Sequence, residues 1–182
     1  MEKICTRLKN GELVWGDKFD ENDFKELKNI FRDWRNLNKR IKRLGGRNLN
    51  VPDVLSEALY CYFFNAIRTN GTAHSYDAVD IKTGEGIQIK SASIKDDCTS
   101  FGPTSTWDRL YFVDFAPNGN VDGNVFFYEI ISDNINKLVL NKKDNETFED
   151  QQKQKRRPRF SVKNRFIKPL SIESVFKINL MD

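Results

Sequence analysis

The chain has 182 residues, of which 38% are hydrophobic, 31% charged and 12% aromatic. This length suffices for one domain with a buried core, and the composition excludes a largely disordered protein. We therefore expect a single domain over residues 1–182 that contains a basic, polar segment, 141–168. No apolar run approaches the ~20 residues of a membrane span, and the first residues lack the apolar stretch of a secretory signal, which predicts a cytoplasmic protein without membrane partners.

The net charge of +4 is unevenly distributed along the chain. Residues 25–47 contain nine basic and two acidic side chains, and residues 153–168 contain eight basic side chains and no acidic one. Two basic segments over an acidic remainder that can hold a cation are typical of nucleic-acid chemistry. Solvated surface faces have the same composition, so charge alone leaves both interpretations open. The three cysteines and the single histidine, His74, show no spacing typical of a disulfide framework or a zinc site.

The first predicted helix begins at Phe24, where apolar residues recur every three or four positions as far as Leu44. Asp20 or Asn22 would cap it, and the following Gly45 would end it. Its basic residues lie largely off the apolar stripe, where they can face phosphates or water.

A second helix is predicted from Asn50 as N-cap, through Pro52 in the first turn, to about Ile67. Glu57 lies beside its buried stripe, where a carboxylate can border a cleft. Residues 69–73, TNGTA, are predicted to form a turn.

Residues 75–93, SYDAVDIKTGEGIQIKSAS, predict a β-hairpin around a Gly-rich turn. Further strands are expected at 110–115 and 125–131, a short helix at 134–140, a flexible polar stretch at 141–158, and strand-like segments at 160–167 and 171–180. This order favours an α+β or α/β protein with a mixed central β-sheet flanked by helices.

The hairpin carries the residue types that a metal-assisted cut of a phosphodiester needs. A carboxylate such as Asp77 can hold Mg²⁺, which polarises the phosphate and lowers the pKa of bound water. The two-residue period of a strand places Gln88 and Lys90 on one face, and the main-chain carbonyl of Ile89 between them can also face a metal ion. Lys90 can orient the water and offset charge on the phosphate.

These residues resemble the PD-(D/E)xK nucleases, especially the type II restriction endonucleases, whose core contains DA, a turn with TG, and then E-I-K-(S/A)-x-S. The resemblance extends from LSEALYCYFF to WDRLYFVDF and includes the basic QQKQKRRPRFSV. Less closely, the chain is similar to the small enzymes of this kind that cut GC-N-GC sites. The resemblance implies a restriction-endonuclease-like core and Mg²⁺-dependent hydrolysis of double-stranded DNA at a short palindromic site.

Carried over residue by residue, the resemblance implies that Asp77, Gln88, Lys90 and Glu57 are catalytic, and that Asp77, Gln88, Glu57 and the carbonyl of Ile89 hold the metal. Gln88 departs from the family pattern, which has Asp or Glu at this position, so the site has one negative charge fewer. Asp80 is the alternative metal ligand.

DNA contacts are predicted from two groups of residues. They are Ser91, Ser93 and Lys95 after the catalytic strand, and Arg156, Arg157 and Arg159 in the basic segment, which could contact guanines or phosphates. Cutting both strands of a palindrome implies a homodimer. Two other functions remain open from the sequence: a structure-selective repair or recombination nuclease of the same fold, and a catalytically inactive DNA-binding protein.

Overall fold

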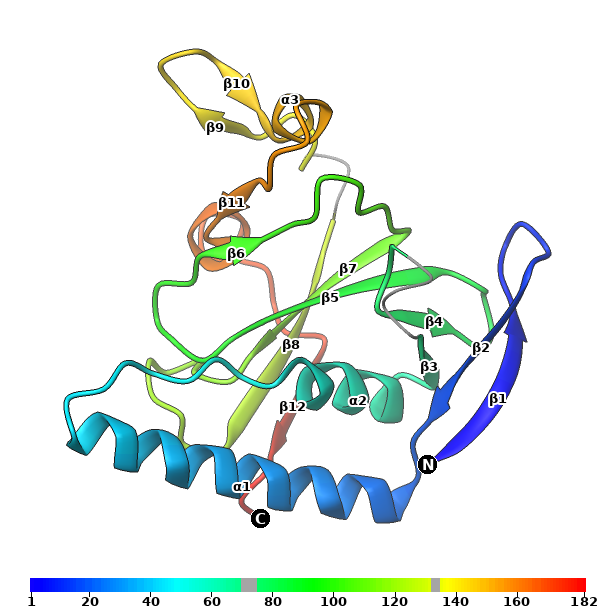
Figure 1. Cartoon of the computed structure of the whole chain (residues 1–182), viewed down its shortest axis with the longest axis vertical. Helices are drawn as coiled ribbons and strands as arrows, with labels where there is room; N and C mark the ends of the chain where they lie inside the picture. The colour runs from blue at the N-terminus through cyan, green and yellow to red at the C-terminus, as the bar shows by residue number, and fades with distance from the viewer. Residues whose placement is uncertain (70–74, 132–134) are drawn as a thin grey trace.

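The computed structural model describes residues 1–69, 75–131 and 135–182. In this part of the chain one sheet has eight strands, in the order β1-β2-β3-β4-β5-β7-β8-β12 (Figure 1). Its strands are β1 (Glu2–Arg7), β2 (Leu13–Lys18), β3 (Ala66–Thr69), β4 (Ala78–Asp80), β5 (Gly86–Ala92), β7 (Arg109–Asp114), β8 (Asn124–Ile130) and β12 (Phe176–Asn179). β5 and β7 are parallel and the other neighbouring pairs are antiparallel.

Helices and two small strand pairs complete the structure. The helices are α1 (Glu21–Arg43), α2 (Asp53–Phe63), α3 (Phe148–Lys153) and the π-helical turn η2 (Lys163–Ile167). The small pairs join β6 (Thr99–Ser100) to β11 (Arg159–Phe160), and β9 (Val139–Asn141) to β10 (Glu146–Thr147). A mixed sheet flanked by helices confirms the predicted α+β fold with a restriction-endonuclease-like core. No described helix is both long and apolar enough to cross a membrane.

The sheet has an apolar core on each face, because neighbouring residues of a strand point to opposite sides. On β7, Tyr111 and Val113 pack into the core beneath α1 and α2, whereas Leu110 and Phe112 pack into a second core. The second core is closed by aromatic side chains of the carboxy-terminal half, including Phe148 of α3 and Phe160 of β11. Figure 1 shows α1 and α2 along one side of the sheet and α3 with β9 and β10 at the far end.

The first helix is confirmed, and Asp20 is its cap. The Asp20 carboxylate accepts hydrogen bonds from the main-chain N–H groups of Asn22 and Asp23, and Asp23 accepts one from the Asp20 N–H in return. This reciprocal capping box satisfies N–H groups that a helix start leaves without partners.

Both predicted ends of the second helix are wrong. The helix starts at Asp53, and the Asn50 carbonyl instead accepts a hydrogen bond from the Trp34 indole at 2.9 Å. It ends at Phe63 because Asn65 adopts a left-handed φ of 52°, after which the chain turns into β3. Ile67, predicted to end the helix, is therefore a buried strand residue.

The hairpin at 75–93 and the strands at 110–115 and 125–131 are confirmed as β4–β5, β7 and β8. Gly84 in the hairpin turn has a φ of +70°, and a Cβ there would lie 2.5 Å from the Arg7 carbonyl oxygen. The turn therefore packs closely on the loop between β1 and β2, a strand pair that the sequence did not predict.

The carboxy-terminal predictions are mostly wrong. Of the expected helix at 134–140, residue 134 lies outside the described residues, 135–137 form a turn, and 139–140 belong to β9. The segment 141–158 folds into a hairpin and α3, because Thr147 and Asp150 form a capping box and Phe148 is buried. Segment 160–167 is mainly η2, whereas 171–180 does contain β12. The turn expected at 69–73 falls largely on 70–74, outside the described residues.

Candidate active site

The candidate site lies at an open edge of β5. Along one edge β7 pairs with residues 87–92, but on the other edge β4 pairs only with Gly86 and Ile87. The rest of that edge has no partner strand in the described part of the chain. A cleft of about 800 Å³ opens there, bordered by β5, α2 and the segment between α1 and α2.

The Asp77 side chain accepts hydrogen bonds at the part of this β5 edge that has no described partner strand. Its carboxylate accepts a hydrogen bond from the Ile89 N–H at 2.7 Å and another from the Gln88 amide. Because the N–H and C=O groups of one strand residue point to the same edge, the Ile89 carbonyl also faces the open side. Asp77 and Ile89, which the sequence resemblance implies as metal ligands, both line the cleft.

Gln88 is nearly fully buried and does not line the cleft. Its amide nitrogen, rather than its oxygen, points to Asp77. The amide would have to turn over before its oxygen could hold a cation, so in this structure Gln88 supports Asp77 as a hydrogen-bond donor.

Glu57 reaches the cleft from α2, with the Arg68 guanidinium 4.0 Å away. Burial, and then the neighbouring Asp77 charge, raises the pKa of Glu57 to about 7. Burial likewise raises the pKa of Asp77, although Lys90 opposes that shift. Asp53, one helical turn before Glu57, also lines the cleft and adds to the negative potential.

Lys90 extends into the same cleft from the middle of β5. Its ammonium lies 5.7 Å from the centre of the Phe101 ring, and no carboxylate of the described residues forms an ion pair with it. Lys90 is thus positioned by an aromatic face and remains available for a phosphate oxygen or a water.

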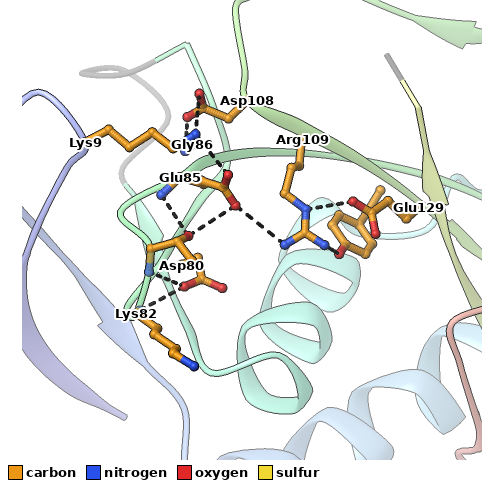
Figure 2. A network of polar contacts seen from close by, with 10 residues as sticks. Lys9, Asp80, Lys82, Glu85, Gly86, Asp108, Arg109 and Glu129 are labelled. Atoms are coloured by element: carbon orange, nitrogen blue, oxygen red, sulfur yellow. Dashed lines mark hydrogen bonds and ion pairs between the residues drawn. The ribbon is translucent and has the colours of Figure 1, made fainter. Parts of the chain in front are cut away.

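Asp80, the alternative ligand, does not line the cleft. Its carboxylate accepts hydrogen bonds from the N–H groups of Lys82 and Thr83, both at 2.8 Å. Figure 2 shows this turn within a polar network in which Arg109 contacts both Glu85 and Glu129. The structure thus favours Asp77 over Asp80 as the candidate metal ligand in the cleft.

The donor set fits a hard divalent cation. Among the described residues no three His, Cys, Asp or Glu side chains converge closely enough to form a metal cluster. Mg²⁺, however, usually takes one or two carboxylates and keeps several waters. Asp77 and Glu57 beside the Ile89 carbonyl provide such oxygen donors. Burial is the main cause of the raised pKa of Glu57, and the Asp77 charge adds to it, a repulsion that a bound cation would offset.

The residues predicted to contact DNA fall into two groups. Ser91 and Ser93 line the cleft, and Lys95 lies just beyond it. Arg159 on β11 pairs with Ser100, a cleft residue, so it lies at the rim. Arg156 instead forms an ion pair with Glu146, which also accepts hydrogen bonds from Gln151 and Gln154.

Three residues that shape the site are not among those predicted from the sequence. Asp53 could have been found from its four-residue spacing to Glu57 on one helix. Arg68 and Asp97 could not, because their partners are distant in sequence. Asp97 lines the cleft wall and accepts hydrogen bonds from the Ser161 hydroxyl at 2.6 Å and the Val162 N–H at 2.7 Å.

Acidic groups, a main-chain carbonyl and a lysine at one open strand edge are the arrangement expected of a metal-assisted nuclease. Comparison with known proteins gives the same class. A model of the Bsp6I restriction endonuclease family matches residues 19–169. The chain is also 36% identical over 166 residues to the type II restriction enzyme Bsp6I of Bacillus sp. (strain RFL6), covering 90% of this chain and 91% of that enzyme.

The chain therefore belongs to the Bsp6I restriction endonuclease family and is a type II restriction endonuclease, a site-specific deoxyribonuclease. A search of solved structures found no match.

Proposed function

We propose that this protein uses Mg²⁺ to hydrolyse phosphodiester bonds in double-stranded DNA at a short palindromic site, and that it acts as a homodimer in the cytoplasm. The observation that supports this most directly is the meeting of Asp77, Glu57 and Lys90, from three parts of the chain, in one cleft. Membership of the restriction endonuclease family indicates DNA as the substrate, and the residues of the cleft support metal-assisted hydrolysis.

Each residue of the cleft has a distinct role in this proposal. Asp77, Glu57 and the Ile89 carbonyl hold the cation, and Gln88 fixes the Asp77 carboxylate through its amide. Bound Mg²⁺ supplies a Lewis acid that polarises the phosphate and lowers the pKa of water. Lys90 orients the attacking water and offsets the negative charge that develops on the phosphate.

The DNA contacts follow from the shape of the cleft. Ser91 and Ser93 continue the catalytic strand along the cleft wall, and Arg159 lies beside Ser100 at its rim. Arg157, two residues earlier, is exposed, and neither arginine forms an ion pair with a described residue. We assign Arg156 a structural role, because Glu146 already neutralises it. The described residues supply one set of proposed catalytic groups, so a second copy of the chain would cut the other strand of a palindrome.

The test is cleavage of plasmid DNA with Mg²⁺, with an EDTA control, followed by sequencing of the fragment ends. The first defined substrate is a duplex with a GC-N-GC site, given the resemblance of the sequence to enzymes that cut there. Discrete fragments that share one short palindrome, and that are lost with EDTA, Asp77→Ala and Lys90→Ala, are expected. Lys82→Ala on the same hairpin is the matched control, because its exposed ammonium has no described partner.

Other outcomes would contradict the proposal. Cleavage that follows DNA structure without a common sequence would indicate a repair or recombination nuclease. Tight binding with intact DNA, unaffected by Lys90→Ala, would indicate an inactive DNA-binding protein in which Gln88 marks the lost site.

A further inference from the structure

A second, basic groove continues from the catalytic cleft. Its volume is about 410 Å³, and it shares Lys42, Asn48, Ser93 and Ile94 with the cleft. Its walls are the carboxy-terminal half of α1 on one side and the start of the β5–β6 loop with the turn at 119–122 on the other. We call it the α1 groove.

Three lysines give the α1 groove its charge. Lys39 and Lys42 lie three residues apart on one face of α1, and Lys95 faces them from the loop after β5. All three are exposed, and none forms an ion pair or side-chain hydrogen bond with any described residue. Asp122 is the one carboxylate among the groove's residues, so the potential there is positive.

The groove walls are held by contacts that do not use these lysines. Arg35, one turn before Lys39, donates from Nε to the Val121 carbonyl at 2.8 Å and so fixes the turn to α1. The Asn38 amide oxygen, buried on the same helix, accepts a hydrogen bond from the Leu49 N–H at 3.0 Å. The helix, the segment after it and the turn therefore form a fixed frame, and the lysine ammonium groups are left for an external anion.

We propose that the α1 groove binds the phosphate backbone of duplex DNA beside the bond that is cut, with Lys39, Lys42 and Lys95 each contacting phosphate. This inference rests on the proposed function, and it adds the path that the DNA takes away from the catalytic groups. A row of unpaired lysines that continues directly from a phosphodiester-cleaving cleft matches the repeating charge of a DNA strand. Such contacts give affinity without sequence preference and release condensed counterions.

The experiment measures the salt dependence of binding to a labelled mixed-sequence duplex in EDTA, where no cleavage occurs. Each phosphate contact contributes about 0.9 to the slope of log K against log salt concentration. Each substitution removes one contact from each protomer of the homodimer. Lys39→Ala, Lys42→Ala and Lys95→Ala should therefore each reduce the slope by about 1.8 and weaken binding of the dimer by about sixtyfold in 0.1 M salt. The triple variant should reduce the slope by about 5.4.

Arg40→Ala is the matched control, because Arg40 is equally exposed on α1 but does not line the groove. It should change affinity by less than about twofold, the difference expected of a general charge effect. On a second duplex that contains the mapped cleavage site, substituting single phosphates by neutral methylphosphonates should weaken wild-type binding at a few positions beside the cut. The same substitutions should leave binding of the triple variant unaffected.

The outcomes separate the two proposals. If the wild-type protein cleaves DNA but the three lysine variants keep the wild-type slope, or match Arg40→Ala, the groove proposal is wrong and the proposed function stands. If the wild-type protein neither binds nor cleaves DNA, the proposed function fails, and the groove proposal fails with it.

Discussion

The inner and outer sides of loop 93–97, which follows β5, use charge in opposite ways. On the inner side, the Lys163 ammonium donates to Asp114 at 2.6 Å and to the Ile94 carbonyl at 3.0 Å, and both charged side chains are almost fully buried. On the outer side, Lys95 is exposed in the α1 groove and has no described partner. The buried lysine fixes the shape of the loop, and the exposed lysine is available to contact DNA.

Burial therefore decides what a basic residue does here. A buried charge must be paired at high cost, so its loss affects folding. An exposed charge in a groove contributes little to stability, so its loss should affect binding alone. The carboxylates of Asp77 and Glu57 lie between these extremes, because they are largely buried yet open to the cleft.

The largest effect is expected from breaking the inner pair. Lys163→Met leaves the Asp114 carboxylate buried without its counter-charge and should lower the free energy of unfolding by about 3–5 kcal/mol. Urea unfolding of the purified variant measures this loss.

The double variant Lys163→Met with Asp114→Asn is the control for that interpretation. Its neutral amide can keep the hydrogen bond that Asp114 accepts from the Ala116 N–H. It should recover most of the lost stability, and equal losses in the single and double variants would show that the buried charge is not the cause.

The cleft should show the second largest effect, with the opposite sign. The pKa of Glu57 is raised from 4.5 to about 7 in the folded protein, so folding favours its neutral form. Stability is therefore lost as the pH rises from 4.5 to 7, and the full loss persists above 7. Without metal at pH 8, Glu57→Gln should raise the free energy of unfolding by up to about 3 kcal/mol.

The same variant should cleave DNA poorly, because an amide is a weaker cation ligand than a carboxylate. Unfolding at pH 4 provides the internal control, since both side chains are then mostly neutral and the two proteins should be equally stable. A variant no more stable than wild type at pH 8 would show that Glu57 carries no strain of this kind.

The sequence predicted the β4–β5 hairpin better than the carboxy-terminal half, for a physical reason. Asp77, Gln88 and Lys90 lie within one local β-hairpin, whose alternation and Gly-rich turn are visible in neighbouring residues. In the carboxy-terminal half, Asp97 contacts Ser161 and Lys163 contacts Asp114, partners far apart in the chain.

For the same reason, the number of basic residues in segment 153–168 overestimates the positive charge that is left unpaired. Lys163 is buried against Asp114, and Lys153 and Arg156 form ion pairs with Glu149 and Glu146. The positive charge that can reach DNA is therefore smaller than the eight basic residues of the segment suggest. Only the folded arrangement shows which of them remain unpaired.

Substitutions of Arg159 and Arg156 test the difference between an unpaired arginine and one that is paired within the protein. Arg159 is exposed beside Ser100 at the cleft rim, so Arg159→Ala should weaken DNA binding by about 1–3 kcal/mol. A loss of affinity that depends on the identity of one base pair would indicate a guanine contact. An equal loss of affinity on all sequences, with a smaller slope of log K against log salt concentration, would indicate a phosphate contact.

Arg156→Ala removes a charge that Glu146 already neutralises, so the variant should bind DNA within about twofold of wild type. Glu146→Gln should then strengthen binding slightly, because it frees Arg156 and removes one negative charge from the protein. Gel-shift titrations of the three variants on one duplex give the comparison. If Arg156→Ala weakened DNA binding as much as Arg159→Ala, an ion pair within the protein would not prevent an arginine from contacting DNA.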